Sequence, residues 1–214
     1  MGLAGSTDRH PDRERAGRPD DGPDVSGADS RIDGLADLLA DRGQLTDERW
    51  RRVLHQAPRH LFAPSRGYAV PGSPGGPTER IIDRQADEAG WWDGVYADMA
   101  IITQRDDGAG DPASPQGLAT CSLSAPGVVV PFLELLDPRP GQAVLEIGTG
   151  TGWTAGLLCA AIGQDSVTTI EIAASSAISF SAGHSVTAVH GQRVTQPRRM
   201  PPAMRVRSSS PLTW

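Results

Sequence analysis

Apolar residues recur at helical spacing near the start of the chain. We expect Ser30 to cap a first helix, whose apolar side chains continue at helical intervals up to Gly43: Ile32, Leu35, Leu38 and Leu39. We expect Thr46 to cap a second helix, with apolar side chains at i, i+3, i+4 and i+7: Trp50, Val53, Leu54 and Ala57. Pro58 then stops the helical pattern. The sequence thus predicts two amphipathic helices before residue 58.

The helical period is absent from the next sixty or so residues. Clusters of Gly, Pro and Asp at 71–78 and 106–112 predict turns, and the region reads as loops with a short strand within 96–103. A helix is predicted after Pro126, ending near Pro138. Its apolar face consists of Val128, Val129, Phe132, Leu133 and Leu136.

The clearest pattern begins at residue 143. A short strand at 143–147 runs into a glycine-rich turn at 148–152, and a helix at 153–162 is closed by Gly163. A β-branched strand follows at 167–172. Strand, turn, helix and strand within about 30 residues form a βαβ unit, so we expect parallel strands and a right-handed crossover. A weaker third strand is expected near 186–189.

Composition and charge narrow the function classes. Hydrophobic residues make up 38% of the 214 residues, with 25 Gly and 18 Pro, which favours one folded core with disordered ends. The formal net charge of -6 gives no indication of a nucleic-acid partner. The locally basic end of the chain, with five arginines after residue 192, reads as an unstructured tail.

Cysteine and histidine spacing favours no metal site. The two cysteines lie outside any CxxC motif and the five histidines show no HExxH spacing, so we expect neither zinc nor disulfides. A reducing, cytoplasmic location fits this usage. No apolar run approaches the 18 residues of a membrane span, and the start of the chain has no hydrophobic signal core. We therefore expect a cytoplasmic monomer without membrane contact.

The glycine turn carries the chemistry. Gly148, Gly150 and Gly152 allow a sharp turn that a ligand can approach closely, and the next helix begins there with free N–H groups. Glu146 precedes them in a strand, where a carboxylate is costly without a partner, and a cationic ligand would supply one. Glu171 lies 19 positions after Gly152, where an acid can hold a ribose diol. The alternatives are a plain tight turn and an exposed strand-end acid.

The form of the motif favours one cofactor. A nicotinamide site has GxGxxG, with its third glycine one position later than here. The ExGxGxG form with a strand-end acid is instead that of S-adenosylmethionine-dependent methyltransferases. The candidate cofactor-binding residues are therefore Glu146, Gly148, Thr149, Gly150, Gly152 and Glu171.

Upstream motifs resemble one methyltransferase family. Ser122-Leu-Ser-Ala-Pro126, one helix and then the glycine turn are similar to protein-L-isoaspartate O-methyltransferases. The stretches 56–64 and 96–98 also resemble that family, so the match runs with gaps over about 35–172. The resemblance implies a protein or peptide substrate with an L-isoaspartyl residue, S-adenosyl-L-methionine as cofactor, and Ser124 as the catalytic hydroxyl that orients the acceptor carboxylate. The competing interpretation is that Ser124 caps the helix after it.

The chain also departs from that family. Gly127 stands where members have His or another larger residue, Ser122 replaces Thr, and the loop-rich stretch 65–95 is longer. Beyond Glu171 the pattern degrades, and only about three parallel strands can be counted. We expect a truncated or frame-shifted chain, the alternative being a partner that supplies the remaining strands. The chain also resembles enzymes that methylate aspartates of one ribosomal precursor peptide, and an inactive remnant is a third hypothesis.

The predicted fold class is α/β: a Rossmann-like three-layer sandwich with an incomplete sheet and a helical N-terminal extension. We expect a disordered leader at 1–29 and a helical and loop region at 30–118. A partial cofactor-binding domain at 119–192 and an irregular tail at 193–214 follow.

Overall fold

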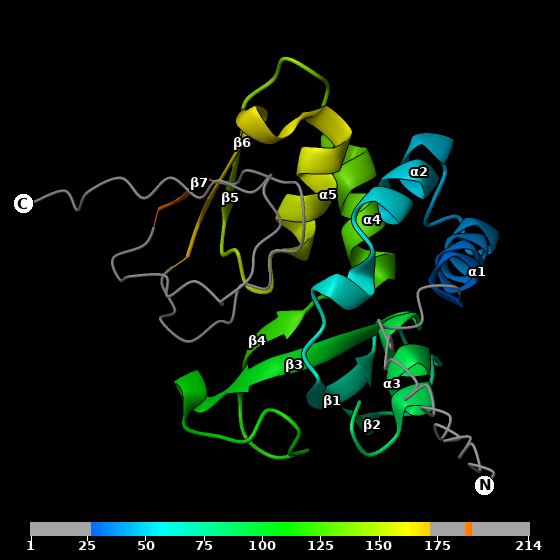
Figure 1. The fold of residues 1–214 in the computed structure, drawn as a ribbon, viewed down its shortest axis with the longest axis vertical. Helices are drawn as coiled ribbons and strands as arrows, with labels where there is room; N and C mark the ends of the chain where they lie inside the picture. The colour runs from blue at the N-terminus through cyan, green and yellow to red at the C-terminus, as the bar shows by residue number, and fades with distance from the viewer. Residues whose placement is uncertain (1–26, 172–186, 190–214) are drawn as a thin grey trace, which may run out of the picture.

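The computed structural model describes residues 27–171 and the backbone of 187–189 (Figure 1). The predicted tail lies outside the described residues, as do residues 1–26 of the predicted leader. The helical elements are α1 (Ala28–Asp41), α2 (Glu48–Gln56), η2 (Arg59–Leu61), α3 (Glu88–Val95), η3 (Asp106–Gly108), α4 (Pro126–Leu136), α5 (Trp153–Ile162) and η4 (Gln164–Ser166). The strands are β1 (Arg66–Pro71), β2 (Arg80–Asp83), β3 (Met99–Arg105), β4 (Ala119–Leu123), β5 (Val144–Ile147), β6 (Val167–Ile170) and β7 (Thr187–Val189).

Both N-terminal helices form where the apolar period predicts them, but their caps differ from the prediction. Gly27 is the N-cap of α1, so Ser30 lies inside the helix and the predicted leader extended two residues too far. The cap of α2 is Asp47, whose side chain accepts a hydrogen bond from Arg49 N at 2.8 Å. Thr46 lies one residue before this cap, and its hydroxyl donates to Glu134 Oε2 of α4 at 2.6 Å.

The region expected to consist mainly of loops contains a four-stranded antiparallel sheet. Its strand order is β2-β1-β3-β4, and β3 confirms the short strand expected within 96–103. The other three strands escaped prediction because they are short, and β1 also contains the turn formers Gly67 and Pro71. Gly67 is required by packing, since a Cβ there would lie 2.9 Å from both Ile101 Cγ2 and the carbonyl oxygen of Ile102. The N-terminal extension is therefore a helical and β-sheet unit.

The predicted βαβ unit is confirmed. β5 and β6 pair in parallel, with Val144 opposite Val167 and Ile147 opposite Ile170, and α5 connects them. β7 adds a third parallel strand beside β6, as expected from the weak pattern near 186–189. In Figure 1, helices α2, α4 and α5 lie together on one side of this sheet. The α/β class follows from the parallel strands and their crossover helix.

The apolar face predicted for α4 is divided between core and surface. Val129, Val130 and Leu133 are buried, but Val128, Phe132 and Leu136 are exposed, as is Leu135. On β5, the edge strand of the parallel sheet, Leu145 and Ile147 are exposed too. A surface hollow lined by Leu136, Pro138, Gln142, Ala143 and Val144 connects the end of α4 with β5. Apolar surface thus continues from α4 to the sheet edge within the described part of the chain.

Within the described residues, every helix is too short or too polar to cross a membrane.

We predict that Glu134→Ala lowers the free energy of unfolding by about 1–3 kcal/mol, because three donors at the start of α2 lose their acceptor. Glu134 accepts from the backbone N–H groups of Thr46 and Asp47 at 2.8 and 2.9 Å, besides the Thr46 hydroxyl. Urea unfolding measures the change. The control, Glu88→Ala, removes an exposed ion pair with Arg84 and should change stability by less than about 1 kcal/mol. Equal effects of the two variants would contradict the prediction.

Candidate functional site

The glycine turn between β5 and α5 has the backbone shape that its sequence predicts. Gly148, Gly150 and Gly152 have φ values of 90°, 53° and 85°, a region that other residues rarely adopt. The turn is attached to the end of β6, because Gly148 N donates to the carbonyl oxygen of Ile170 at 2.8 Å. It therefore lies where the carboxyl ends of two parallel strands meet, the edge of an open α/β sheet at which ligands bind.

Glu146 is half-buried on β5 and accepts a short hydrogen bond. The Thr169 hydroxyl on β6 donates to Glu146 Oε2 at 2.6 Å, and the Thr149 and Thr169 hydroxyl oxygens are 2.6 Å apart. Burial raises the pKa of Glu146 to about 7, and the charge of Glu171 adds to the increase, while the Thr169 hydrogen bond opposes it. Near neutral pH this carboxyl group is therefore poised between its two charge states.

Glu171 follows β6 and folds onto the glycine turn. Its Oε2 accepts a hydrogen bond from Gly150 N at 2.8 Å. The structure thus brings the six candidate cofactor-binding residues into one site: Glu146, Gly148, Thr149, Gly150, Gly152 and Glu171. Thr169 joins them, although the sequence analysis did not select it. The signal that could have found it is strand register, because Thr169 is the direct partner of Glu146 across β5 and β6.

Ser124 lies exposed in the short connection between β4 and α4. The N-cap of α4 is Ala125, and no side chain caps the helix from that position. The first turn of α4 is instead bound by Asp98, whose Oδ1 accepts from Gly127 N at 2.8 Å. The interpretation that Ser124 serves as the cap therefore finds no support in this geometry. The catalytic role of Ser124 remains a prediction.

The same contact explains why residue 127 is a glycine. A Cβ on Gly127 would lie 2.7 Å from Asp98 Oδ2 and 2.8 Å from Asp98 Oδ1. Asp98 cannot move away easily, because its side chain is buried and pairs with Arg42 at 3.0 Å. A larger residue at 127 would thus displace the carboxylate that binds the start of α4.

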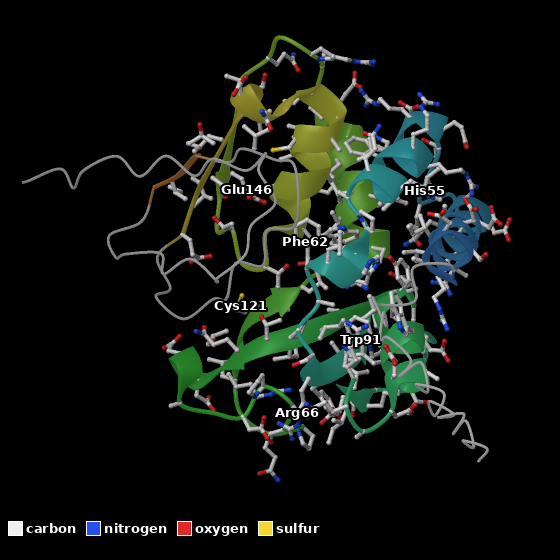
Figure 2. All side chains as sticks on the ribbon, viewed as in Figure 1. His55, Phe62, Arg66, Trp91, Cys121 and Glu146 are labelled. Carbon is white, nitrogen blue, oxygen red and sulfur yellow. The ribbon has the colours of Figure 1, made fainter. Side chains whose placement is uncertain are left out.

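The glycine turn lies against β4, the strand that leads into the Ser124 connection. A Cβ built on Gly150 would lie 3.5 Å from Cys121 Sγ and 3.8 Å from the carbonyl oxygen of Ser122, both on β4. Figure 2 shows Cys121 on β4 at the side of the antiparallel sheet that faces the strand carrying Glu146. The site is therefore formed where the two sheets meet, with the turn contributed by one and the serine connection by the other.

We predict that Glu146→Gln stabilises the protein at pH 8 but not at pH 4. Folding raises the pKa of Glu146 from its ordinary 4.5 to about 7, so the native protein holds a proton that the unfolded chain has lost between these values. The contribution of Glu146 to stability therefore falls as pH rises from about 4.5 to 7, by about 2–3 kcal/mol. Chemical unfolding at several pH values measures this. A pH-independent difference from the native chain, or the same profile in the exposed control Asp165→Asn, would contradict it.

Residues 98–196 match the family model described as Protein-L-isoaspartate(D-aspartate) O-methyltransferase (PCMT). A protein-L-isoaspartate O-methyltransferase of Methanothermobacter thermautotrophicus is 29% identical over 137 residues, which are 64% of this chain and 45% of that protein. Protein-L-isoaspartate O-methyltransferase 1 of Archaeoglobus fulgidus is 29% identical over 130 residues, 61% of this chain and 42% of that protein. The similar enzyme of Aeropyrum pernix is 54% identical over 37 residues, 17% of this chain and 14% of that protein.

Two solved structures are also similar. A protein-L-isoaspartate O-methyltransferase superposes with a TM-score of 0.45 at 19% identity, over 69% of this chain and 36% of that one. A protein from Plasmodium falciparum, described as a putative protein-L-isoaspartate O-methyltransferase in complex with S-adenosyl-L-homocysteine, has a TM-score of 0.45 at 14% identity, over 68% and 50% of the two chains. The chain spans less than half the length of the curated relatives named above. Residues 98–196 are thus similar to the protein-L-isoaspartate O-methyltransferase family.

Proposed function

We propose that the protein transfers a methyl group from S-adenosyl-L-methionine to the carboxylate of an L-isoaspartyl residue in a protein or peptide. One observation carries the proposal: a glycine turn with two carboxylates lies against the strand that leads into Ser124. Both parts belong to the segment that matches the family model. The role that follows is repair of damaged proteins in the cytoplasm, by a monomer.

The residues present fit the cofactor. Among the described residues, nothing lies within 4 Å of a Cβ placed on Gly148, so none of them covers the backbone of the turn there. The Glu146 carboxyl, with its pKa near 7, would be ionised by the positively charged amine of the cofactor. Glu171, at the end of β6, would accept from the two ribose hydroxyl groups in exchange for its bond with Gly150 N.

The reaction requires orientation rather than proton transfer. The bound cofactor supplies a methyl group on a positively charged sulfur. The acceptor carboxylate is already ionised at neutral pH, so one of its oxygens forms the new C–O bond as the carbon–sulfur bond breaks, leaving a methyl ester and a neutral thioether. Ser124 would donate a hydrogen bond to the other carboxylate oxygen and align the acceptor with the methyl carbon. The Ser124 connection and the residues around the glycine turn would exclude competing water.

Cofactor binding tests the assignment of Glu171. We predict that Glu171→Ala weakens the affinity for S-adenosylhomocysteine by about 1–3 kcal/mol, because the ribose hydroxyls lose their acceptor. Isothermal titration calorimetry on the full chain measures this. Asp165→Ala, which removes an exposed acid from η4, is the matched control and should bind as the native chain does. Equal binding by Glu171→Ala would remove the ribose assignment.

Methyl transfer tests the assignment of Ser124. We predict that Ser124→Ala lowers kcat for an isoaspartyl peptide by about 10–100-fold, because a misaligned acceptor reacts slowly. The affinity for S-adenosylhomocysteine should stay unchanged, since the hydroxyl is assigned to the acceptor. Labelled methyl incorporation measures turnover, with the loop variant Ser114→Ala as the control.

The same assay identifies the acceptor. The native chain should methylate an isoaspartyl peptide faster than the matching aspartyl peptide. The opposite preference would contradict the proposed substrate and favour a dedicated precursor peptide as acceptor.

A further inference from the structure

Arg59 is the most unusual buried residue near the proposed site. It is only 1% exposed, and its guanidinium donates to backbone carbonyl groups of three different segments. The carbonyl oxygens lie at the end of α3, at the start of β3 and at the end of β4: Val95 at 2.7 Å, Ala97 at 3.4 Å, Met99 at 2.8 Å, Leu123 at 3.3 Å and Ser124 at 2.9 Å. One side chain thus binds the backbone of Ser124, the residue proposed to orient the acceptor carboxylate.

The plane of the same guanidinium faces α5. Its central carbon lies 5.0 Å from the centre of the Trp153 ring, within range of a cation–π interaction. Trp153 is the first residue of α5, directly after Gly152, and its indole N–H donates to the carbonyl oxygen of Ala57 at 3.1 Å. Arg59 therefore lies between the serine connection and the helix that begins at the glycine turn.

A neighbouring contact fixes this segment against α5. A Cβ on Gly156 would lie 2.7 Å from Phe62 Cζ, so the ring packs directly on the helix backbone. Figure 2 shows Phe62 between the two sheets, next to η2. The segment from Ala57 to Phe62 is thus attached to α5 by Trp153 and Gly156, and to the antiparallel sheet by Arg59.

Burying a guanidinium costs free energy, so its presence here indicates a structural requirement that an apolar side chain would not meet. Its hydrogen bonds go to carbonyl oxygens, and Asp98 contributes a favourable charge nearby. A lysine could not replace it, because an ammonium group lacks the planar fork that reaches several segments while stacking on an aromatic ring. The arrangement fixes distances and angles between segments far apart in the sequence.

We propose that Arg59 is a positioning residue for methyl transfer, which sets the Ser124 backbone relative to the start of α5 and so to the glycine turn. Arg59 acts through Ser124 and Trp153. Its guanidinium N–H groups bind the Ser124 side of the site, and its face stacks on Trp153 at the start of α5. The inference rests on the proposed function, because alignment of acceptor and methyl group is what that reaction requires.

A double-mutant cycle tests the link without any ligand. Amide hydrogen exchange is measured for the Leu123–Ala125 segment in the full chain, with Arg59→Met, Trp153→Leu and the double variant. We expect Trp153→Leu to speed amide exchange in this segment about tenfold when Arg59 is present. In the Arg59→Met variant the same substitution should change exchange little, because Trp153 affects the segment through the guanidinium. Additive effects would overturn the proposal. If Trp153→Leu fails to fold, Trp153→Phe replaces it, since a phenyl ring binds a cation less strongly.

Kinetics test the consequence for the reaction. Arg59→Lys should lower kcat for an isoaspartyl peptide at least about tenfold, with the affinity for S-adenosylhomocysteine within about threefold of the native value. Arg49→Lys is the matched control, because Arg49 also stacks on a tryptophan and donates to a backbone carbonyl, but at Trp50 and Pro138. Parallel losses of turnover and cofactor affinity in Arg59→Lys would show a general structural role and overturn the proposal.

The two hypotheses fail in different ways. A native chain that binds no S-adenosylhomocysteine and methylates no peptide would contradict the proposed function, whereas the exchange cycle still decides whether Arg59 links the two segments. Additive exchange effects in a chain that does methylate would overturn the role of Arg59 alone.

Discussion

Two sheets without a common strand must be fixed to each other, and one short segment contacts both sides. Residues 57–62 place the guanidinium of Arg59 among carbonyl groups of the antiparallel sheet and its neighbours, and place Phe62 against the backbone of α5. A buried cation that binds several carbonyl groups tolerates little displacement, because each lost hydrogen bond leaves a polar group unsatisfied. The glycine turn and the Ser124 connection therefore keep a fixed relation, although they come from different sheets.

Electrostatics at the glycine turn follow from the same geometry. Glu146 lies on β5 and Glu171 directly follows the adjacent parallel strand β6, and both lie at the glycine turn. The Thr169 hydroxyl donates to Glu146 and the Gly150 N–H donates to Glu171, while the Thr149 hydroxyl pairs with that of Thr169. Burial is the main cause of the raised pKa of Glu146, and the charge of Glu171 adds to it. A ligand with a cationic group would reduce the repulsion between the two carboxylates.

Local patterns predicted the elements whose stability is local. The βαβ unit, α2 and α4 were predicted because their apolar period and their Gly or Pro boundaries lie within each element. The candidate cofactor residues lie together, as their positions in the sequence predict, because a glycine turn at a strand end leaves few places for the acids. Their role in cofactor binding stays a prediction. What failed depended on distant partners: Glu134, 88 positions away, binds Thr46, and Asp98 binds the start of α4. Arg59 escaped notice for the same reason, since its role is defined only by the segments that surround it.

Such distant contacts would matter for the proposed methylation of a carboxylate. An ionised carboxylate needs no general base, so the protein has to supply alignment and a dry, correctly charged site. The described part of the chain has features that suit this demand: a hydroxyl at the end of β4, two carboxylates at the turn and a buried guanidinium that joins the segments carrying them. Glu146 would then act through its charge, holding a cation, and its raised pKa means that this holding requires loss of a proton. Binding and alignment are thus expected to depend on separate residues, Glu146 and Glu171 for the cofactor, Arg59 and Ser124 for the acceptor.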